Sequence, residues 1–483
     1  MRRLVMASFV LVAFIVVAVA GASVMVASPG PSPFVSCTAD NAAAQIGSGS
    51  VLYPNSEIEP RSAINPTNPL NIVGEYQQDR WSDGGARGLV ASVTHDGGTT
   101  WTRVVVPGLT KCSDGSYDRA SDPWLSFAPN GDLYAISLSF DVFDSHNAII
   151  ASKSTDGGNT WSAPKEITSD YTDGLDKESI TVDPRNSNVV YATWDRLLSP
   201  GGSLHASDSG YFNARSYKSQ TFFSKSVDGG ATWSPPQQIY TDSSFSGSIG
   251  GMIRVLTDGT LVDGLVTYGS ADWKGGKCAS LATLTSTDGG ATWTSKPTII
   301  HPESCTYSGA HDPDTGAHIR SGGLIDFTTD GSNEYAVVED ALANAPTTGR
   351  VLFFQSINGG PWSAPTVISQ TPAGIDAFVP TIAVNADHTI GVTYYDFRNN
   401  TPGGSADTDY WLTRCSSACT NPANWSEVHV AGPFDMHQAP VARGEFVGDY
   451  QGLTTSGNAF QPFFIQAGTT SSNPTDAYFD SIP

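Results

Sequence analysis

Pairs of acidic and basic side chains near the ends of predicted strands are the first candidates for chemistry in this sequence. A guanidinium group donates two parallel hydrogen bonds to a carboxylate, either on a bound ligand or elsewhere in the protein. Such pairs can line a functional pocket or join neighbouring parts of the fold, and their recurrence favours the second role. The pairs are Asp79-Arg80, Asp195-Arg196 and Asp396–Arg398.

Two aromatic residues stand at the predicted starts of strands, and neither recurs at that position in other parts of the chain. Trp124 follows Asp122-Pro123, and Tyr450 follows Gly448-Asp449. Aromatic faces of this kind suit stacking against a sugar ring. We expect both residues to face the interior of a ligand pocket.

The sequence gives little support to a metal site or to several other classes of catalytic site. Asp312 and Asp314 lie in the loop GAHDPDTGAH, which would suit calcium, although it matches no EF-hand and can equally be a solvated loop. We therefore name no certain cofactor and keep calcium as an open possibility. The nine histidines show no ligand spacing, and there is no GxSxG, HExxH, P-loop or dinucleotide fingerprint.

A short turn sequence is written four times and indicates how these residues are positioned. Each copy has Ser or Thr, then Asp-Gly-Gly, then a Trp, and two decayed copies end at Trp362 and Trp425. Glycines take the positive φ values of a hairpin turn, and the Asp carboxylate accepts backbone N–H bonds there. The four copies are THDGGTTW (94–101), STDGGNTW (154–161), SVDGGATW (226–233) and STDGGATW (286–293).

A second element, strand–turn–strand, precedes the hairpins and occurs seven times. WLSFAPNGDLYAISL (124–138) and TIAVNADHTIGVTYY (381–395) are two of its copies. A unit is therefore four strands, with the Trp-marked hairpin joining the third and fourth. Four-stranded units repeated around an axis form a β-propeller, so we predict an all-β fold of this architecture.

The seventh strand–turn–strand element needs two further strands. Ala477–Ile482 is a candidate for its third strand, and Ile46–Tyr53, before the first full unit, is a candidate for its fourth. A ring sealed by both ends of the chain would have seven blades, which we favour. Six blades with a C-terminal extension are the alternative.

The repeated turn closely resembles the Asp-box, or BNR repeat, of the sialidase-like (neuraminidase) propellers. The resemblance extends over nearly all of the mature chain. It implies that the boxes lie at the periphery as scaffold, that their Trp is buried between neighbouring sheets, and that a ligand binds on the central axis. Propellers host catalytic and non-catalytic proteins alike.

The resemblance also implies a set of site residues. Sialidases place three arginines on the substrate carboxylate and use a Tyr nucleophile, a Glu that activates it and an Asp acid, unlike the paired carboxylates of most glycosidases. Here Arg61 is followed by Ser-Ala where that family has Ile-Pro, which weakens the match. The candidate catalytic residues are Arg61, Arg80 and Arg320 for the carboxylate, Asp83 as acid, Glu178 and Arg196 as the family's Glu–Arg pair, and Tyr395 or Tyr450 as nucleophile.

The expected function is an exo-acting glycoside hydrolase, sialidase-like, that acts on extracellular glycans. The alternative is a non-catalytic propeller that binds glycan, protein or cell-wall material. A net charge of −22 argues against nucleic acid as a partner. We expect a monomer.

The N-terminal segment predicts export of the protein, and the six cysteines predict disulfides. Arg2 and Arg3 precede an apolar run, so residues 1–22 (Met1–Ala22) are expected to be a secretory signal peptide, with an uncleaved anchor as the alternative. Residues 23–45 are expected to be a flexible leader and 46–483 one propeller domain without a membrane span. The local disulfide pairs would be Cys415–Cys419 and Cys278–Cys305, which leaves Cys37–Cys112.

Overall fold

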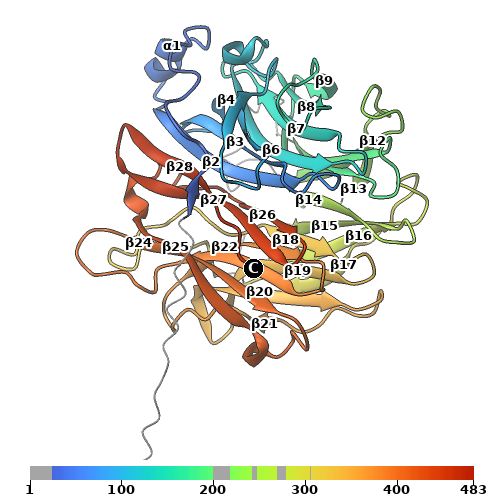
Figure 1. The fold of residues 1–483 in the computed structure, drawn as a ribbon, viewed down its shortest axis with the longest axis vertical. Coiled ribbons are helices and arrows are strands. Elements are labelled where there is room, and N and C mark those ends of the chain that lie inside the picture. Colours follow the sequence, from blue (N-terminus) through green and yellow to red (C-terminus); the bar gives the residue numbers. More distant parts are fainter. Residues whose placement is uncertain (1–23, 199–217, 242–246, 269–278, 305) are drawn as a thin grey trace, which may run out of the picture.

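Strands dominate the fold. The computed structural model describes residues 24–198, 218–241, 247–268, 279–304 and 306–483 (Figure 1). In these ranges the one α-helix, α1 (Ala42–Gly47), has six residues. No helix of the described chain has the length and apolar character needed to cross a membrane. The predicted all-β class is confirmed.

The described strands form seven groups of four, and neighbouring strands within a group are antiparallel. One residue pair, Ala86 with Ala120, joins the first two groups into a larger sheet. The first three groups are β2 (Leu52–Ile64), β3 (Ile72–Trp81), β4 (Ala86–Thr94) and β5 (Thr102–Val105); β6 (Arg119–Phe127), β7 (Leu133–Phe140), β8 (Asn147–Ser154) and β9 (Lys165–Asp170); and β10 (Gly174–Val182), β11 (Val190–Leu198), β12 (Lys218–Ser226) and β13 (Gln237–Tyr240). The next three are β14 (Gly247–Val255), β15 (Leu261–Tyr268), β16 (Ser280–Ser286) and β17 (Thr298–Pro302); β18 (Ile325–Thr329), β19 (Glu334–Leu342), β20 (Ala345–Ser356) and β21 (Thr366–Val367); and β22 (Ala377–Val384), β23 (Ile390–Asp396), β24 (Asp407–Cys415) and β25 (Ser426–Asp435). The last is β26 (Gly452–Ser456), β27 (Ala459–Thr470), β28 (Asn473–Phe479) and β1 (Met25–Val26).

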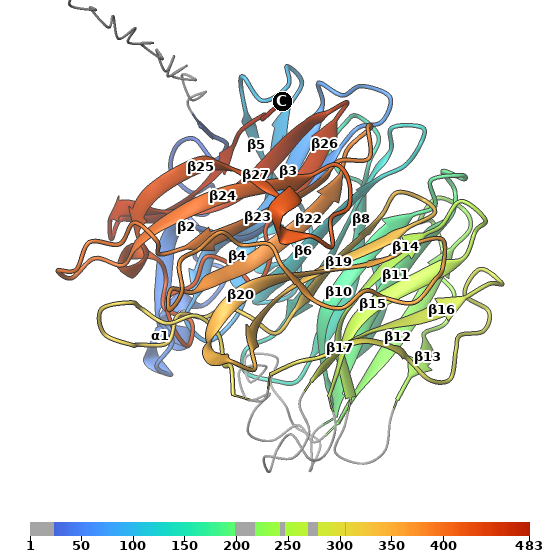
Figure 2. The same ribbon diagram turned by 90° about the horizontal axis from the view of Figure 1, so that it is seen from below.

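The first strands of the groups lie next to one another in chain order. β2 contacts β6, β6 contacts β10, and the order continues through β14, β18 and β22 to β26, which contacts β2 again. Figures 1 and 2 show the sheets following one another around the molecule, with the red C-terminal strands beside the blue N-terminal ones. A closed series of four-stranded sheets is a β-propeller, so the predicted architecture is confirmed.

The last group corrects two expectations about the chain ends. Its fourth strand is β1, which pairs with β28, and not Ile46–Tyr53, whose residues end α1 and begin β2. The segment expected to be a flexible leader is packed from residue 24 onward. Phe34 is buried in the core, where it fills the space above Gly88, and Cys37 is bonded to Cys112.

The DGG turns join third and fourth strands, as predicted, and share one hydrogen-bond pattern. Thr94 Oγ1 donates to Asp96 Oδ1 (2.7 Å) and accepts from the Gly98 backbone N–H (3.0 Å). Asp96 also accepts from the backbone N–H and the hydroxyl of Thr100, and these bonds lower the pKa of Asp96 to about 2. The same bonds recur in the turns that begin at Ser154, Ser226 and Ser286.

The Trp residues after these turns pack against the preceding unit of the ring. Trp101 contacts Phe479 of the last unit with ring centroids 5.1 Å apart, and Trp293 contacts Phe223 of the unit before it at 5.4 Å. The repeated stretch is therefore scaffold that joins neighbouring sheets. The Cys415–Cys419 disulfide closes the turn before Trp425, as expected, whereas Cys278 and Cys305 lie outside the described residues.

Candidate active site

Five of the first strands contain the same bulge, and these bulges shape the axis of the propeller. In each strand two residues oppose one residue of the second strand, and the first of the two has a positive φ between 49° and 75°. A left-handed conformation costs a non-glycine residue roughly 1–2 kcal/mol, and such strain is concentrated at functional sites. The bulged residues, all of which line axial cavities, are Glu59, Asp122, Lys177, Gly250 and Val379.

The larger space, here called the outer cavity, has a volume of about 680 Å³. Its walls combine bulged residues with the loops that precede first strands or join second to third strands, so it opens on one face of the propeller. A volume of this size lies within the range of small-molecule sites. Four cationic and eight acidic side chains line it, which makes electrostatics the dominant feature.

Three arginines, Arg80, Arg320 and Arg443, line the outer cavity, and two of them lie over the Phe446 ring. Arg320 lies 3.8 Å and Arg80 5.4 Å from the ring centroid. Arg320 donates two hydrogen bonds to Asp449 (3.2 and 2.7 Å). Arg443 has no hydrogen bond or ion pair with the described residues, and its side chain is exposed in the cavity. Partial desolvation by the surrounding cavity wall lowers the pKa of Arg443 to about 10, and repulsion from Arg320 contributes to this shift.

Lys177 is the charge centre of the cavity floor. Its ammonium nitrogen lies 2.8 Å from Asp122, 2.9 Å from Asp449 and 3.5 Å from Glu59. Desolvation opposes the charge, but these carboxylates outweigh it and raise the pKa of Lys177 well above its usual range. Burial raises the pKa of Glu59 to about 7, and repulsion from Asp122 and Asp449 acts in the same direction. Lys177 opposes this shift but does not cancel it.

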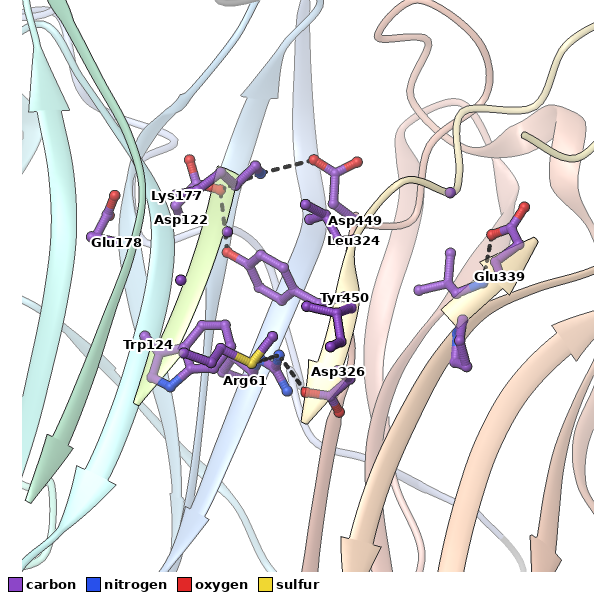
Figure 3. A pocket seen from close by; sticks show the side chains of 17 residues that line it. Arg61, Asp122, Trp124, Lys177, Glu178, Leu324, Asp326, Glu339, Asp449 and Tyr450 are labelled. Atoms are coloured by element: carbon purple, nitrogen blue, oxygen red, sulfur yellow. Dashed lines mark hydrogen bonds and ion pairs between the residues drawn. The ribbon is translucent and has the colours of Figure 1, made fainter. Parts of the chain in front are cut away.

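Arg61 lies in a second, smaller space of about 30 Å³, here called the inner pocket (Figure 3). Its guanidinium carbon is 3.7 Å from the Trp124 ring centroid and 5.0 Å from that of Tyr450. It also forms an ion pair with Asp326 (3.2 Å) and donates to the Gln451 carbonyl (3.1 Å). Of the predicted trio, Arg61 lines the inner pocket, whereas Arg80 and Arg320 line the outer cavity.

Tyr450 and Glu178 both line the inner pocket. The Tyr450 hydroxyl donates to Asp122 (3.3 Å), which belongs to both spaces, and burial together with the charge of Asp122 raises the pKa of Tyr450 well above its usual range. Glu178 is 2% exposed, and neither of its carboxylate oxygens has a hydrogen-bond partner among the described residues. Burial, and then Asp122, raise the pKa of Glu178 well above its usual range.

The remaining predicted residues have other partners. Asp83 lines the outer cavity but pairs with Arg119 (2.8 Å). Arg196 pairs with Asp170 and Asp173, both at 2.9 Å, and lines neither axial space. Tyr395 is buried in a core cluster, where its hydroxyl donates to the Ile465 carbonyl (2.6 Å).

The neighbouring Asp and Arg residues of the sequence mostly do not pair with one another. Arg398 does contact Asp396 (2.6 Å), but Arg80 contacts Glu59 and Asp195 accepts the Gly250 N–H. Glu59, Lys177 and Arg443 line the outer cavity but were not among the predicted site residues. Glu59 precedes a Pro at a bulge, as Asp122 does, and this shared acid-Pro dipeptide is a signal that could have found it; Lys177 and Arg443 carry no comparable signal.

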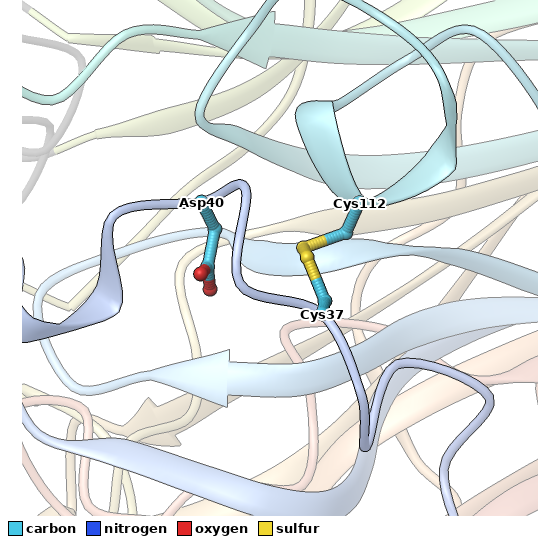
Figure 4. A group of neighbouring side chains, drawn as sticks. All are labelled: Cys37, Asp40 and Cys112. Carbon is cyan, nitrogen blue, oxygen red and sulfur yellow. A yellow bond between two sulfur atoms is a disulfide. The ribbon is translucent and has the colours of Figure 1, made fainter.

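The described residues give little support to a metal site. The one group with suitable spacing in those ranges is Cys37, Asp40 and Cys112 (Figure 4). The two sulfurs are joined in a disulfide, and Asp40 is paired with Arg87 (2.7 Å), so this group has no thiolate to offer a metal. In the loop considered for calcium, Asp312 is paired with His437 and Asp314 accepts hydrogen bonds from Asn400 and Gly403.

The fold and the charged axial cavity define a propeller with a candidate ligand site on its axis. No protein-family model and no curated protein sequence matches the chain. It is similar to the Hadza microbial sialidase Hz136 (15% identity, 86% of this chain and 74% of that one, TM-score 0.47) and to the Penicillium chrysogenum α-L-arabinanase complexed with arabinobiose (12%, 88% and 93%, 0.44). It is also similar to the Trypanosoma rangeli sialidase in complex with sialic acid (11%, 79% and 55%, 0.41). We base no functional argument on likenesses this distant.

Proposed function

We propose that the protein is a secreted, sialidase-like Asp-box propeller that acts on extracellular glycans as an exo-acting glycoside hydrolase. Its substrate is a terminal sugar that carries a carboxylate. One observation carries the proposal: Arg443 presents an unpaired guanidinium to a cavity of about 680 Å³, beside Arg80 and Arg320. An exposed guanidinium without a protein partner is a ready site for a ligand carboxylate.

The carboxylate would be held first by Arg443. Arg320 already shares its hydrogen bonds with Asp449, so it adds positive potential more than free donors. The sugar ring then reaches toward the floor, where Glu59, Asp122 and Lys177 lie. This placement brings the glycosidic bond to the group with the most closely spaced acids.

Glu59 on the floor and Tyr450 in the adjoining inner pocket suit the chemistry of hydrolysis, since Asp122 lines both spaces. Glu59 has a pKa of about 7, so it retains its proton at mildly acidic pH and can donate it to the leaving glycosidic oxygen. Tyr450 can attack the anomeric carbon while Asp122 accepts the phenolic proton, because the two are hydrogen-bonded. Water then releases the sugar from the Tyr450 ether, and the protons return to Tyr450 and Glu59.

A non-catalytic binding function is the second candidate, and one observation favours it. Lys177 and Arg320 already neutralise Asp122 and Asp449, which is the arrangement expected of a stable polar lining. In that case the same Arg443 would hold an anionic glycan without bond cleavage.

Turnover of fluorogenic glycosides tests the proposal. Mature protein is incubated at pH 5 with a 4-methylumbelliferyl α-sialoside and the matching β-glucuronide. We expect hydrolysis of one of them. Arg443→Ala should raise KM about tenfold or more, and Tyr450→Phe should lower kcat about 100-fold or more. Arg185→Ala is the matched control, since Arg185 pairs with Asp183 at an exposed position and lines neither axial space.

The outcomes separate the two candidates. No turnover of either glycoside, together with binding of the free sugar acid that Arg443→Ala weakens, favours the non-catalytic propeller. Neither turnover nor binding contradicts both functions. A loss in Arg185→Ala equal to that in Arg443→Ala would show that the effect is not specific to the cavity.

A further inference from the structure

Two exposed aromatic side chains lie in loops on the face of the propeller where the outer cavity opens. Among the residues that the structure describes, Phe143 (55% exposed) and Tyr171 (66%) are the aromatic side chains that remain open to solvent. Phe143 belongs to the loop between β7 and β8, and Tyr171 to the loop between β9 and β10. β7 ends at Phe140, which lines the outer cavity, and β10 supplies Lys177 to it.

Tyr171 is the outermost ring of a stack of three. Its ring lies on the His146 imidazole with centroids 4.2 Å apart and an interplanar angle of 5°. Tyr117 supports His146 from within the protein at 4.8 Å, and their polar atoms are 3.2 Å apart. One face of Tyr171 is therefore covered by His146, and the opposite face is free to receive a planar ligand.

The loop that carries Tyr171 is held rigidly. Asn147 is fully buried, and its side-chain amide donates to the carbonyls of Ser145, Asp170 and Asp173 (2.8, 3.3 and 3.0 Å). Arg196 pairs with both Asp170 and Asp173 at 2.9 Å. The sequence thus fixes the backbone on both sides of Tyr171 while leaving its ring in water.

Rigid presentation of an exposed aromatic ring points to ligand recognition. The ring of Tyr171 contacts His146 but is 66% exposed, and a preorganised ring lowers the entropy that binding costs. The flat face of Tyr171 suits the C–H face of a sugar ring. Glu166, which accepts a hydrogen bond from Tyr117 (3.3 Å), offers a carboxylate close to the stack for sugar hydroxyls.

We propose that Tyr171, seated on His146, is a binding subsite for a neutral sugar ring of the glycan chain that extends outward from the sugar in the outer cavity. This subsite rests on the proposed function, because a sugar bound at Tyr171 would belong to the part of the glycan on the leaving-group side of the bond to be cleaved. It assigns Arg196 a positioning role for this loop, distinct from catalysis.

Binding of neutral oligosaccharides tests the subsite without any need for catalysis. Mature protein is titrated calorimetrically with cellotetraose, chitotetraose, xylotetraose and arabinotetraose. We expect at least one to bind with a dissociation constant near the millimolar range. Tyr171→Ala should weaken that binding about tenfold, while Tyr171→Phe retains it, since stacking needs the ring and not the hydroxyl.

Two controls make the result specific. Val227→Ala removes a side chain of equal exposure (65%) from a DGG turn, which lies on the opposite face of the propeller, and should leave binding unchanged. Arg185→Ala, at a position that lines neither axial space, should also leave it unchanged. The ligands are neutral and no turnover is measured, so the subsite can hold even if the proposed reaction is wrong. Binding that Tyr171→Ala does not alter, or no binding of any of the four tetrasaccharides, would overturn the proposal.

Discussion

Replacing Lys177 by Met removes the positive charge on which the cavity floor depends. Met has a similar length and keeps the apolar part of the side chain, so the change is mainly electrostatic. The ammonium group is within 3.5 Å of three carboxylates, and all four side chains are at most 11% exposed. The variant therefore leaves Asp122 without its cation, whereas Asp449 keeps Arg320 and Glu59 keeps Arg80.

The expected cost in stability is large. Removing one partner of a buried ion pair typically lowers the free energy of unfolding by about 3–5 kcal/mol, because the other charge stays desolvated. We expect a loss in this range at pH 7. Lys153→Met is the control: Lys153 pairs with Asp132 at 2.9 Å, but their side chains are 28% and 20% exposed, and such pairs contribute about 1 kcal/mol or less.

The pH dependence of this loss gives a second, independent check. Glu59 already has a pKa of about 7, and the loss of Lys177 raises it further. At pH 5 Glu59 is protonated in both proteins and no longer needs the cation. Glu59 is half ionised at pH 7 in the parent protein, so the loss should shrink by about 0.4 kcal/mol between pH 7 and pH 5.

Urea denaturation at pH 7 and pH 5, followed by Trp fluorescence, measures these differences. A loss below about 1 kcal/mol at pH 7, or equal to that of Lys153→Met, would refute the reasoning that Lys177 holds the floor together. An equal loss at pH 5 and pH 7 would refute the assigned role of Glu59.

Three further predictions follow from the same contacts. The double variant Cys37→Ser/Cys112→Ser should lose about 4 kcal/mol of unfolding free energy in urea, because the bridge closes a loop of 75 residues, whereas Cys415→Ser/Cys419→Ser, with a separation of 4, should lose far less. Burial raises the pKa of Glu75 and of Asp263 to about 8, so the folded state holds protons that the unfolded state has released. The urea midpoint should therefore fall as the pH rises from about 4 to 8, and Glu75→Gln should make that fall smaller. Among the acids of the outer cavity, the pKa values of Glu59, Asp176 and Glu339 are raised to about 7 and that of Glu303 to about 8, so these groups lose their negative charge at pH 5. Calorimetric titration with a sugar acid should therefore show tighter binding at pH 5 than at pH 8. The reverse order would contradict an anionic ligand.

The repeated parts of the fold were predictable from the sequence because local chemistry specifies them. The Thr94-to-Trp101 turn needs only its own Asp, glycines and hydroxyls to form, and those residues are written plainly in each copy. The Trp positions also followed from the repeat. The fourth strand of the last unit was mispredicted, since β1 has only two residues and pairs with β28 across the whole length of the chain.

The site was predictable only in part. Trp124 and Tyr450 were expected to face a pocket, and both line the inner pocket with Arg61. The group of Arg80, Arg320 and Arg443 could not be found by spacing, because three separate loops and strands bring it together. Arg61 was expected on a ligand, but Asp326, more than 250 residues away in the chain, takes its guanidinium.

A crystal structure of the mature protein with N-acetylneuraminic acid at saturating concentration and pH 5 tests the central claim most directly. Our account predicts the sugar in the outer cavity, with its carboxylate about 3 Å from the Arg443 guanidinium and its ring above Glu59 and Lys177. A sugar bound outside the axial cavity, or within it with the carboxylate turned away from Arg443, would contradict the account.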